Sequence, residues 1–255
     1  MCTVILSISP GTETPLLVGA NRDEDLNRPS LHFSMSDDGQ VLYPLDVGGG
    51  TWIGASRSGV FAALTNRDDV KDVRGRKSRG ALVTRALRSG SGDLVAKWAD
   101  DLVPSEYNGF RLIVADRLSC TVWEGDGVSS GVAIKILNPG LHVVTGFGLD
   151  TWDIPRCAFI RDELSGRFDI EDLKRVLSSH RSGTVDSDVC IHDPEESHVT
   201  VSSCIVRAST DWTFHVDATP IAPCRTRLRW GRAGGRESAP WDKFQIGPSQ
   251  LDLKK

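Results

Sequence analysis

The chain has 255 residues, of which 39% are hydrophobic and 25% charged, and its formal net charge at pH 7 is −4. This composition is typical of a globular protein with a substantial core, and it excludes a largely disordered chain. The negative charge gives no general reason to expect nucleic acid as a partner, and no apolar run is long enough for a membrane-spanning helix. Because the first residues lack the basic region of a signal peptide, we expect a cytoplasmic protein.

The first predicted element is a β-hairpin. Apolar, β-branched stretches at residues 4–8 and 16–18 flank a turn-rich segment at residues 9–15. Antiparallel pairing around this turn places Cys2 opposite the middle of the tetrad Asn21-Arg22-Asp23-Glu24. We therefore expect the tetrad to lie beside the start of the chain, within reach of its side chains.

The rest of the chain alternates between groups of strands and groups of helices. A second hairpin is predicted within residues 51–66, after the flexible run Gly48-Gly49-Gly50 and with residues 56–59 as its turn. Helices are predicted at residues 78–88 (with Ser78 as cap), 93–102, 155–163 and 170–180, and strands at 110–115, 121–123, 132–136, 142–145, 201–208 and 212–217. Because the helices come in groups and do not separate single strands, we predict an α+β fold built of layers.

A single domain is predicted over residues 1–230, followed by a loosely ordered tail over residues 231–255. Beyond residue 224 the composition shifts towards Arg, Gly, Pro and Lys, with few apolar residues. Arg225, Arg227 and Arg229 alternate as on one face of a strand. This pattern fits either a solvated edge strand or a pocket for an anionic substrate, and we favour the edge strand.

Cys2 is the cysteine most open to a chemical role. The six cysteines are widely spaced without a CxxC pair, so we predict reduced thiols, five of them small buried side chains. If Met1 is removed, Cys2 carries both a thiol and the α-amino group of the chain. A neutral amine can then act as general base for the thiol of its own residue.

Three further residues are candidates to assist Cys2. The cation of Arg22 would favour the thiolate, and the carboxylate of Asp23 would accept a hydrogen bond from the α-amino group. Asn66, at the end of the second hairpin, is a candidate donor to an oxyanion. The alternatives are a surface ion pair for Arg22 and Asp23 and a turn-forming role for Asn66.

Several motifs together resemble the NRDE-motif family, also called the transport-and-Golgi-organisation type. The resemblance covers about the first 160 residues and is carried by Cys2-Thr3, the Asn21–Glu24 tetrad, Arg28-Pro29, the segments 49–66, 78–83 and 107–116, and Leu149-Asp150-Thr151. This family is similar to N-terminal-nucleophile amidohydrolases such as penicillin V acylase and bile-salt hydrolase. The resemblance implies a four-layer αββα sandwich of two antiparallel sheets, with Cys2 as nucleophile after removal of Met1. More loosely, residues 198–224 resemble acyltransferases and amidases that act on penicillin-type amides.

The chain departs from the pattern of these relatives at three places. Ala20 stands where bile-salt hydrolases have an arginine, and Arg22 lies two residues further on the same strand face. Gly146 stands where the family usually has the asparagine that helps to form the oxyanion hole. Val201 stands where an arginine often precedes Ser202-Ser203. We therefore expect one side-chain donor to the oxyanion to be missing at Gly146.

These observations lead to one hypothesis and two alternatives. The hypothesis is an N-terminal-cysteine amidohydrolase that cleaves a linear amide of a small molecule through an acyl-thioester, with Cys2, Arg22, Asp23 and Asn66 as its site. The alternatives are an acyltransferase with the same intermediate and a non-catalytic lipid- or haem-handling protein. No cofactor and no metal is expected, since Cys190 and His192 with His198 lack the paired spacing of a metal site. The expected partner is a small-molecule amide, and a homo-oligomer is left open.

Overall fold

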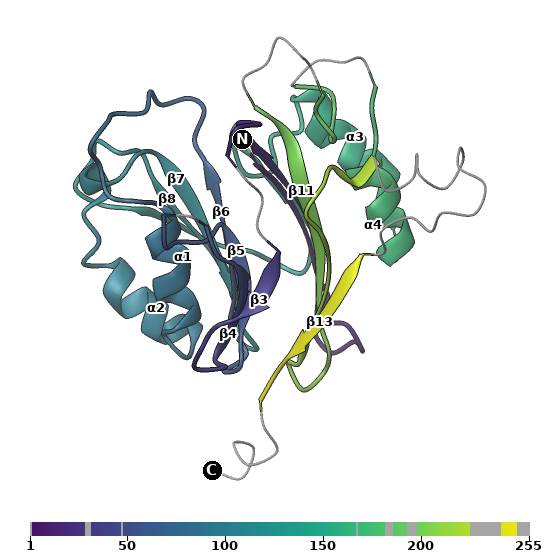
Figure 1. Ribbon diagram of the computed structural model, residues 1–255, viewed down its shortest axis with the longest axis horizontal. Helices are drawn as coiled ribbons and strands as arrows, with labels where there is room; N and C mark the ends of the chain where they lie inside the picture. The colour runs from purple at the N-terminus through teal and green to yellow at the C-terminus, as the bar shows by residue number, and fades with distance from the viewer. Residues whose placement is uncertain are drawn as a thin grey trace.

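Two antiparallel sheets lie face to face between two layers of helices, as Figure 1 shows. The computed structural model describes residues 2–28, 32–46, 48–166, 168–181, 186–192, 198–224 and 241–248. In Figure 1, α1 (Gly80–Leu87) and α2 (Gly92–Ala99) cover one sheet, and α3 (Pro155–Glu163) and α4 (Ile170–Leu177) cover the other. The expected α+β sandwich of four layers is therefore confirmed.

The sheet next to α3 and α4 has the strand order β10-β1-β2-β11-β12-β13, and the sheet next to α1 and α2 has the order β3-β4-β5-β6-β7-β8-β9. The strands of the first sheet are β1 (Cys2–Ile8), β2 (Leu16–Glu24), β10 (Gly140–Val144), β11 (Val199–Ala208), β12 (Phe214–Thr219) and β13 (Asp242–Ile246). Those of the second are β3 (Phe33–Met35), β4 (Val41–Pro44), β5 (Ile53–Ser56), β6 (Phe61–Asn66), β7 (Phe110–Ala115), β8 (Cys120–Gly125) and β9 (Ala133–Ile136). A short 3₁₀ helix, η1, spans Pro104–Glu106.

Both predicted hairpins are confirmed. β1 pairs with β2 so that Cys2 lies opposite Arg22, and β5 pairs with β6. The proposed cap of α1 is wrong, because Arg79 and not Ser78 occupies the N-cap, without a side-chain hydrogen bond. Strands β3, β4 and β13 were not predicted.

The predicted tail needs a correction. Residues 242–246 form β13, which pairs along β12 and adds an edge strand to the first sheet. Lys243 and Gln245 on one face of β13 are exposed, whereas Phe244 and Ile246 on the other face are half-buried and buried. Residues 225–240, with the three alternating arginines, and residues 249–255 lie outside the described residues. The domain boundary at residue 230 stays a prediction.

The core forms because the strands alternate between two apolar faces. On β1, Val4 and Leu6 face the space between the sheets, whereas Ile5 packs with the side chains of α3 and α4. On β6, Phe61 and Ala63 face the same central space, and Leu64 packs towards α1. Strands buried on both faces therefore carry near-continuous apolar runs.

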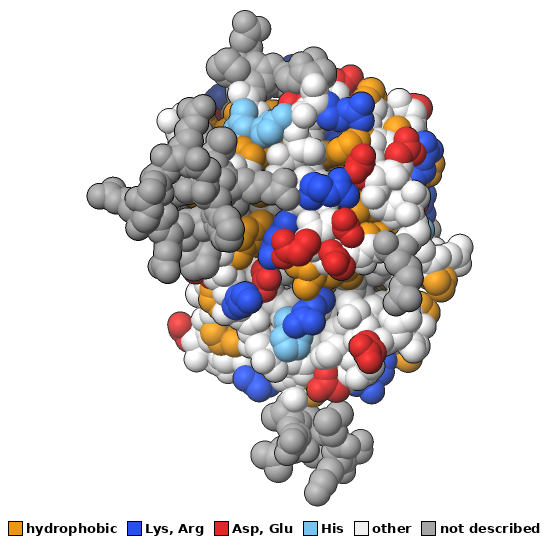
Figure 2. Space-filling view, turned by 90° about the vertical axis from the view of Figure 1, so that its right-hand side faces the viewer, with side chains coloured by type: hydrophobic (Ala, Val, Ile, Leu, Met, Phe, Trp, Pro, Cys, Tyr) orange, Lys and Arg blue, Asp and Glu red, His pale blue; other side chains and the backbone are white. Residues whose placement is uncertain are grey.

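The outer surface over α3 and α4 is mixed in charge. Figure 2 shows this side of the molecule, where positive and negative side chains are interspersed and the hydrophobic ones are scattered. Ion pairs such as those of Lys174 with Glu171 and of Arg175 with Glu163 belong to these helices. Among the described residues, no helix is long and apolar enough to cross a membrane.

The triple-glycine run brings α1 against the second sheet. A Cβ atom on Gly50 would lie 2.8 Å from the backbone carbon of Gly80, the first residue of α1. The backbone N–H of Thr51 donates a hydrogen bond to the carbonyl oxygen of Gly80 across this contact (3.3 Å). Gly50 is thus required by a close approach of two backbones, not by flexibility.

We predict that Gly50→Ala lowers the free energy of unfolding by about 1–3 kcal/mol, because the new methyl group would push α1 away from its sheet. Gly48→Ala is the matched control, since a Cβ at Gly48 meets no atom within 4 Å. Urea unfolding followed by circular dichroism measures both variants. Equal stability of the two would contradict the close approach.

Candidate active site

Cys2 is the first residue of β1, and its side chain faces the space between the two sheets. Strand alternation puts it on the same face as Val4 and Leu6, and the residue is 8% exposed. Figure 1 shows the start of the chain between the two sheets, at one end of the sandwich. The residue opposite Cys2 on β2 is Arg22, as the hairpin predicted.

Arg22 brings a positive charge to this inner face. Its Nη2 donates a hydrogen bond to Oε2 of Glu24 at 3.1 Å, two residues further along the same face. Arg28 pairs with the same oxygen of Glu24 at 2.9 Å and also with Asp46. Arg22 is buried whereas Arg28 is largely exposed, so only Arg22 carries its charge into the interior beside Cys2.

Asp23 points to the opposite side of the sheet, towards α3. Its Oδ1 accepts a hydrogen bond from the hydroxyl of Thr200 at 2.6 Å, and its Oδ2 lies 3.7 Å from Nη1 of Arg156. The same Nη1 donates a hydrogen bond to the hydroxyl of Thr3 at 3.0 Å. Asp23 and Arg156 are both fully enclosed by protein, so this charge pair lies directly behind the first residues of β1.

A β-bulge in β11 places two polar side chains on opposite faces of the sheet. The register shifts between Thr200, which lies opposite Asp23, and Ser202, which lies opposite Arg22. Thr200 therefore faces Asp23 on the helical side, while Ser202 lies in line with Arg22 and Cys2 on the inner side. The extra residue is Val201, one of the three positions that depart from the pattern of the relatives.

The thiol of Cys2 is held mainly in its neutral form. Burial raises the pKa of the Cys2 thiol, and the Asp23 carboxylate acts in the same direction, while the Arg22 guanidinium opposes them. Burial also raises the pKa of Asp23, and the charge of Arg156 opposes that effect. A thiol with a raised pKa is a weak nucleophile at neutral pH, so any chemistry at Cys2 needs a base.

Strand alternation does not place Asn66 on the inner face that Cys2 occupies. It ends β6 and lies opposite Phe110 of β7. By parity it shares the face of Leu64, which packs towards α1, whereas Thr65 faces the loop that follows β10. The role of Asn66 as an oxyanion donor stays a prediction.

Gly146 lies beside the start of β1. Val144 of β10 pairs with Val4 of β1, and continuing this register by two residues leads to Gly146 and Cys2. A Cβ atom on Gly146 would overlap the carboxylate of Asp68. The space that the side chain of the expected asparagine would enter is therefore taken by the side chain of Asp68, a residue that the sequence analysis did not single out.

The loop at Gly146 is tied firmly to the opposite sheet. Arg111 of β7 donates hydrogen bonds from Nη1 to the carbonyl oxygens of Thr145 and Gly146, at 3.2 and 3.0 Å. The backbone N–H of Asp68 donates to the Gly146 carbonyl oxygen at 3.0 Å, and Thr65 donates to that of Thr145 at 3.3 Å. Because both carbonyl groups are engaged, this loop is held in place next to Cys2.

Asn21, the first residue of the tetrad, has a structural position. Its Nδ2 donates hydrogen bonds to the carbonyl oxygens of Leu177 and Val189, at 2.9 and 2.8 Å, and the side chain is buried. These oxygens belong to the end of α4 and to the segment before β11. Asn21 therefore fastens two chain segments to the sheet behind the candidate site.

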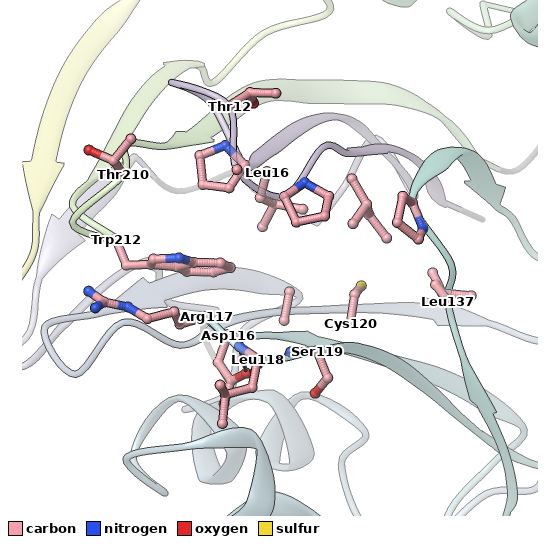
Figure 3. Close-up of a pocket in the computed structure, with 16 residues that line it drawn as sticks. Thr12, Leu16, Asp116, Arg117, Leu118, Ser119, Cys120, Leu137, Thr210 and Trp212 are labelled. Carbon is pink, nitrogen blue, oxygen red and sulfur yellow. Dashed lines mark hydrogen bonds between the residues drawn. The ribbon is translucent and has the colours of Figure 1, made fainter.

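Two cavities flank the inner space at different places. A narrow cleft of about 10 Å³, room for about one water molecule, is lined by Ser202, Trp52 and Phe33 among others. A larger pocket of about 360 Å³ lies at the Ile8 end of β1, away from Cys2. Figure 3 shows Trp212 and Leu118 on its walls.

Cys2 lies on the inner face of the first sheet, where nucleophilic chemistry at its thiol would require a base beside it. Arg22 supplies positive charge on the same face, and the pair of Asp23 and Arg156 fixes the backbone behind it. Arg156 was not predicted as a site residue. The sequence marks it only as a single charged residue among the less polar residues of the segment Ile-Pro-Arg-Cys. Among the described residues, the group suited to a metal ion is not here but consists of His180, Cys190, His192 and Cys224.

The fold is shared with amidases of known structure. An N-acylethanolamine-hydrolyzing acid amidase ortholog from Caenorhabditis elegans aligns over 80% of this chain and 92% of its own, with a TM-score of 0.55 and 16% identity. The mutant C2A of a conjugated bile acid hydrolase from Clostridium perfringens aligns over 98% of this chain and 99% of its own, with a TM-score of 0.53 and 13% identity. At such low identity these likenesses establish the fold alone.

Sequence comparison identifies the family. The Transport and Golgi organization 2 homolog of Mus musculus and the Transport and Golgi organization protein 2 homolog of Homo sapiens are each 34% identical to this chain over 125 residues. The match covers 46% of this chain and 45% of each relative, so it spans about half the length of those proteins. The pattern of the family described as Transport and Golgi organisation 2 matches residues 1–210 of the 255. The chain therefore belongs to the Transport and Golgi organisation 2 family.

Proposed function

We propose that this protein is an amidohydrolase whose nucleophile is the thiol of Cys2, made the first residue by removal of Met1. The observation that carries the proposal is the pairing of Cys2 with Arg22, backed by the charge pair of Asp23 and Arg156. The fold shared with two amidases supports the reaction class. We assign the reaction to the cytoplasm, whose reducing conditions keep Cys2 as a thiol.

The first half of the reaction forms a thioester. The neutral α-amino group of Cys2 takes the proton of the thiol as Sγ bonds to the acyl carbon, and the carbonyl electrons move to its oxygen. When this adduct collapses, the C–N bond breaks and the proton passes from the α-amino group to the leaving nitrogen. The products are a free amine and an acyl group on Cys2.

The second half of the reaction releases the acid. Water attacks the thioester while the α-amino group takes its proton, the C–S bond breaks and Cys2 recovers its thiol. An acyltransferase would follow the same course with an amine in place of water. Asp23 orients the α-amino group, and Arg22 stabilises negative charge on sulfur.

The oxyanion has fewer side-chain donors than the asparagine pattern of the relatives would supply. Gly146 has no side chain to donate a hydrogen bond. Burial raises the pKa of the neighbouring Asp68 carboxyl, while the charges of Arg111 and Arg156 lower it. Backbone N–H groups at the start of β1 therefore carry this role, and Asn66 would contribute only if the end of β6 turns its side chain from the α1 side towards Cys2.

Two solved relatives in fold suggest the first substrates to test. Their titles name an N-acylethanolamine-hydrolyzing acid amidase and a conjugated bile acid hydrolase. We propose N-acyl amides as the substrate class here.

The second candidate function is non-catalytic binding of a small apolar molecule such as a lipid or haem. It is favoured by the pocket of about 360 Å³ between the Ile8 end of β1 and the turn before β8 (Figure 3). This volume lies within the usual range for small-molecule sites, and Pro10, Leu118, Leu137 and Trp212 give it apolar walls. Binding there would not depend on Cys2.

We predict that Cys2→Ala abolishes hydrolysis of N-acyl amides, with a loss of at least about 10³-fold in kcat, since the covalent step has no substitute nucleophile. Cys120→Ala, which removes an equally buried thiol at the other end of the sandwich, should keep activity within about twofold of the parent. Release of free amine from a panel of N-acyl amides measures all three proteins. Equal turnover by Cys2→Ala would contradict the mechanism, and binding without any turnover would favour the second candidate.

We predict that Arg22→Gln shifts the alkylation of Cys2 to higher pH. The pKa of the Cys2 thiol is raised by burial and partly held down by Arg22, so loss of this cation leaves less thiolate at any given pH. The rate of iodoacetamide labelling of the Cys2 peptide, followed by mass spectrometry from pH 6 to 10, gives the shift. Arg28→Gln is the control, because Arg28 binds the same Glu24 but lies at the surface. Identical profiles for Arg22→Gln and the parent would count against the role of Arg22.

We predict that Gly146→Ala is destabilising alone but is tolerated together with Asp68→Gly, because the three atoms nearest to the new Cβ all belong to the Asp68 carboxylate. The two substitutions should therefore couple by about 0.5–3 kcal/mol in a double-mutant cycle of unfolding free energies. Gly131→Ala, where a Cβ meets nothing within 4 Å, serves as the control. Additive effects would show that Asp68 does not fill the space beside Gly146.

A further inference from the structure

Four side chains that can bind metal converge behind the first sheet. They are His180, just after α4, Cys190 and His192 in the segment before β11, and Cys224 after β12. One ligand atom from each lies within 4.8 Å of the ligand atoms of all the others. We propose that these four residues bind a single zinc ion.

The spacing of the ligand atoms fits tetrahedral zinc. Zinc bonds of about 2.3 Å to sulfur and about 2.0–2.1 Å to nitrogen place the ligand atoms of a tetrahedron about 3.3–3.8 Å apart. Nε2 of His192 lies 3.4 Å from Sγ of Cys190 and 2.8 Å from Sγ of Cys224. The observed separations run from 2.8 Å to at most 4.8 Å, and the tetrahedral spacing lies within this range. Small side-chain movements are therefore enough for the four residues to bind zinc.

The chemistry of the four ligands selects zinc over the hard cations. Two thiols and two imidazoles form a set of soft and borderline donors, which suits zinc and not magnesium or calcium. The rings of His180 and His192 are stacked with centroids 5.1 Å apart, and both cysteines are buried. Asp188 lies 4.0 Å from Nδ1 of His180, the kind of outer partner that orients a metal-binding histidine.

The site would be structural and not catalytic. Four protein ligands complete the coordination of zinc and leave no open position for substrate or water. The ligands come from three separate segments of the chain, so the ion would join the end of α4, the segment before β11 and the end of β12. Sequence spacing concealed the cluster, because only Cys190 and His192 are close together, and His198, which lies 3.8 Å from Glu24, is not part of it.

Hydrogen bonds connect this cluster to the candidate active site. The backbone N–H of Ile191, between two of the ligands, donates to the hydroxyl of Thr200 at 2.8 Å, and that hydroxyl donates to Asp23 at 2.6 Å. Asn21 holds Val189, the residue before Cys190, through its carbonyl oxygen. A zinc ion here would therefore fix the segment that supports Asp23, which explains why a structural site lies so close behind the tetrad.

The experiment is the metal content of the purified full-length protein, produced with zinc in the medium and measured by inductively coupled plasma mass spectrometry. We expect about one zinc per chain in the parent and in Cys120→Ser, and close to none in Cys190→Ser and Cys224→Ser. Replacement of zinc by Co²⁺ should give the visible bands of tetrahedral cobalt and the near-ultraviolet band of thiolate ligation. His192→Ala should weaken both the visible bands and the near-ultraviolet band of the cobalt protein.

Two results obtained on the parent protein would overturn the proposal, and they hold even if the cysteine variants fail to fold. One is a protein without zinc or cobalt in which all six thiols react after unfolding. The other is a disulfide between Cys190 and Cys224, found by mass spectrometry of the alkylated, unreduced protein. A parent that holds one zinc but keeps it in Cys190→Ser would also contradict this ligand set.

Discussion

The antiparallel pairing of β1 with β2 is the interaction on which the candidate site depends. Its register puts Arg22 next to Cys2 on the inner face of the sheet and Asp23 on the outer face. A slip of one residue would reverse these faces, and the apolar residues of both strands would then lose the core. The burial of Val4, Leu6, Val18 and Ala20 thus fixes the position of the polar residues as well.

The two faces of this hairpin carry different tasks. The inner face carries the thiol of Cys2, the cation of Arg22 and the hydroxyl of Ser202. The outer face, with Asn21 and Asp23, binds α3, α4 and the segment before β11 through buried hydrogen bonds and the charge of Arg156. In the proposed mechanism the tetrad therefore supports the nucleophile on one side of the sheet, and its buried hydrogen bonds anchor chain segments on the other. If zinc binds behind Asp23, the ion also supports the active site, because hydrogen bonds connect its ligand segment to Asp23 through Thr200.

Sequence reasoning was reliable where local signals determine structure. The turn residues before Leu16 and the β-branched runs predicted the pairing of Cys2 with Arg22, and the grouping of helices predicted the layers. It failed for β3, β4 and β13, which have only three to five residues each, and β3 and β13 also mix polar with apolar residues. It also missed contacts between distant segments, such as Asp68 with Gly146 and Arg156 with Asp23, because no local pattern encodes them.

The most direct test of the account is to find where an acyl group becomes attached. The purified protein is first shown by intact mass to lack Met1, then mixed with a slowly deacylating N-acyl probe, quenched in acid and digested for peptide mapping. The account predicts one acyl group on the N-terminal peptide, bound as a thioester that hydroxylamine removes. An acyl group on another residue would contradict it. So would the absence of any acyl group when protein that lacks Met1 has been exposed to the full range of N-acyl probes.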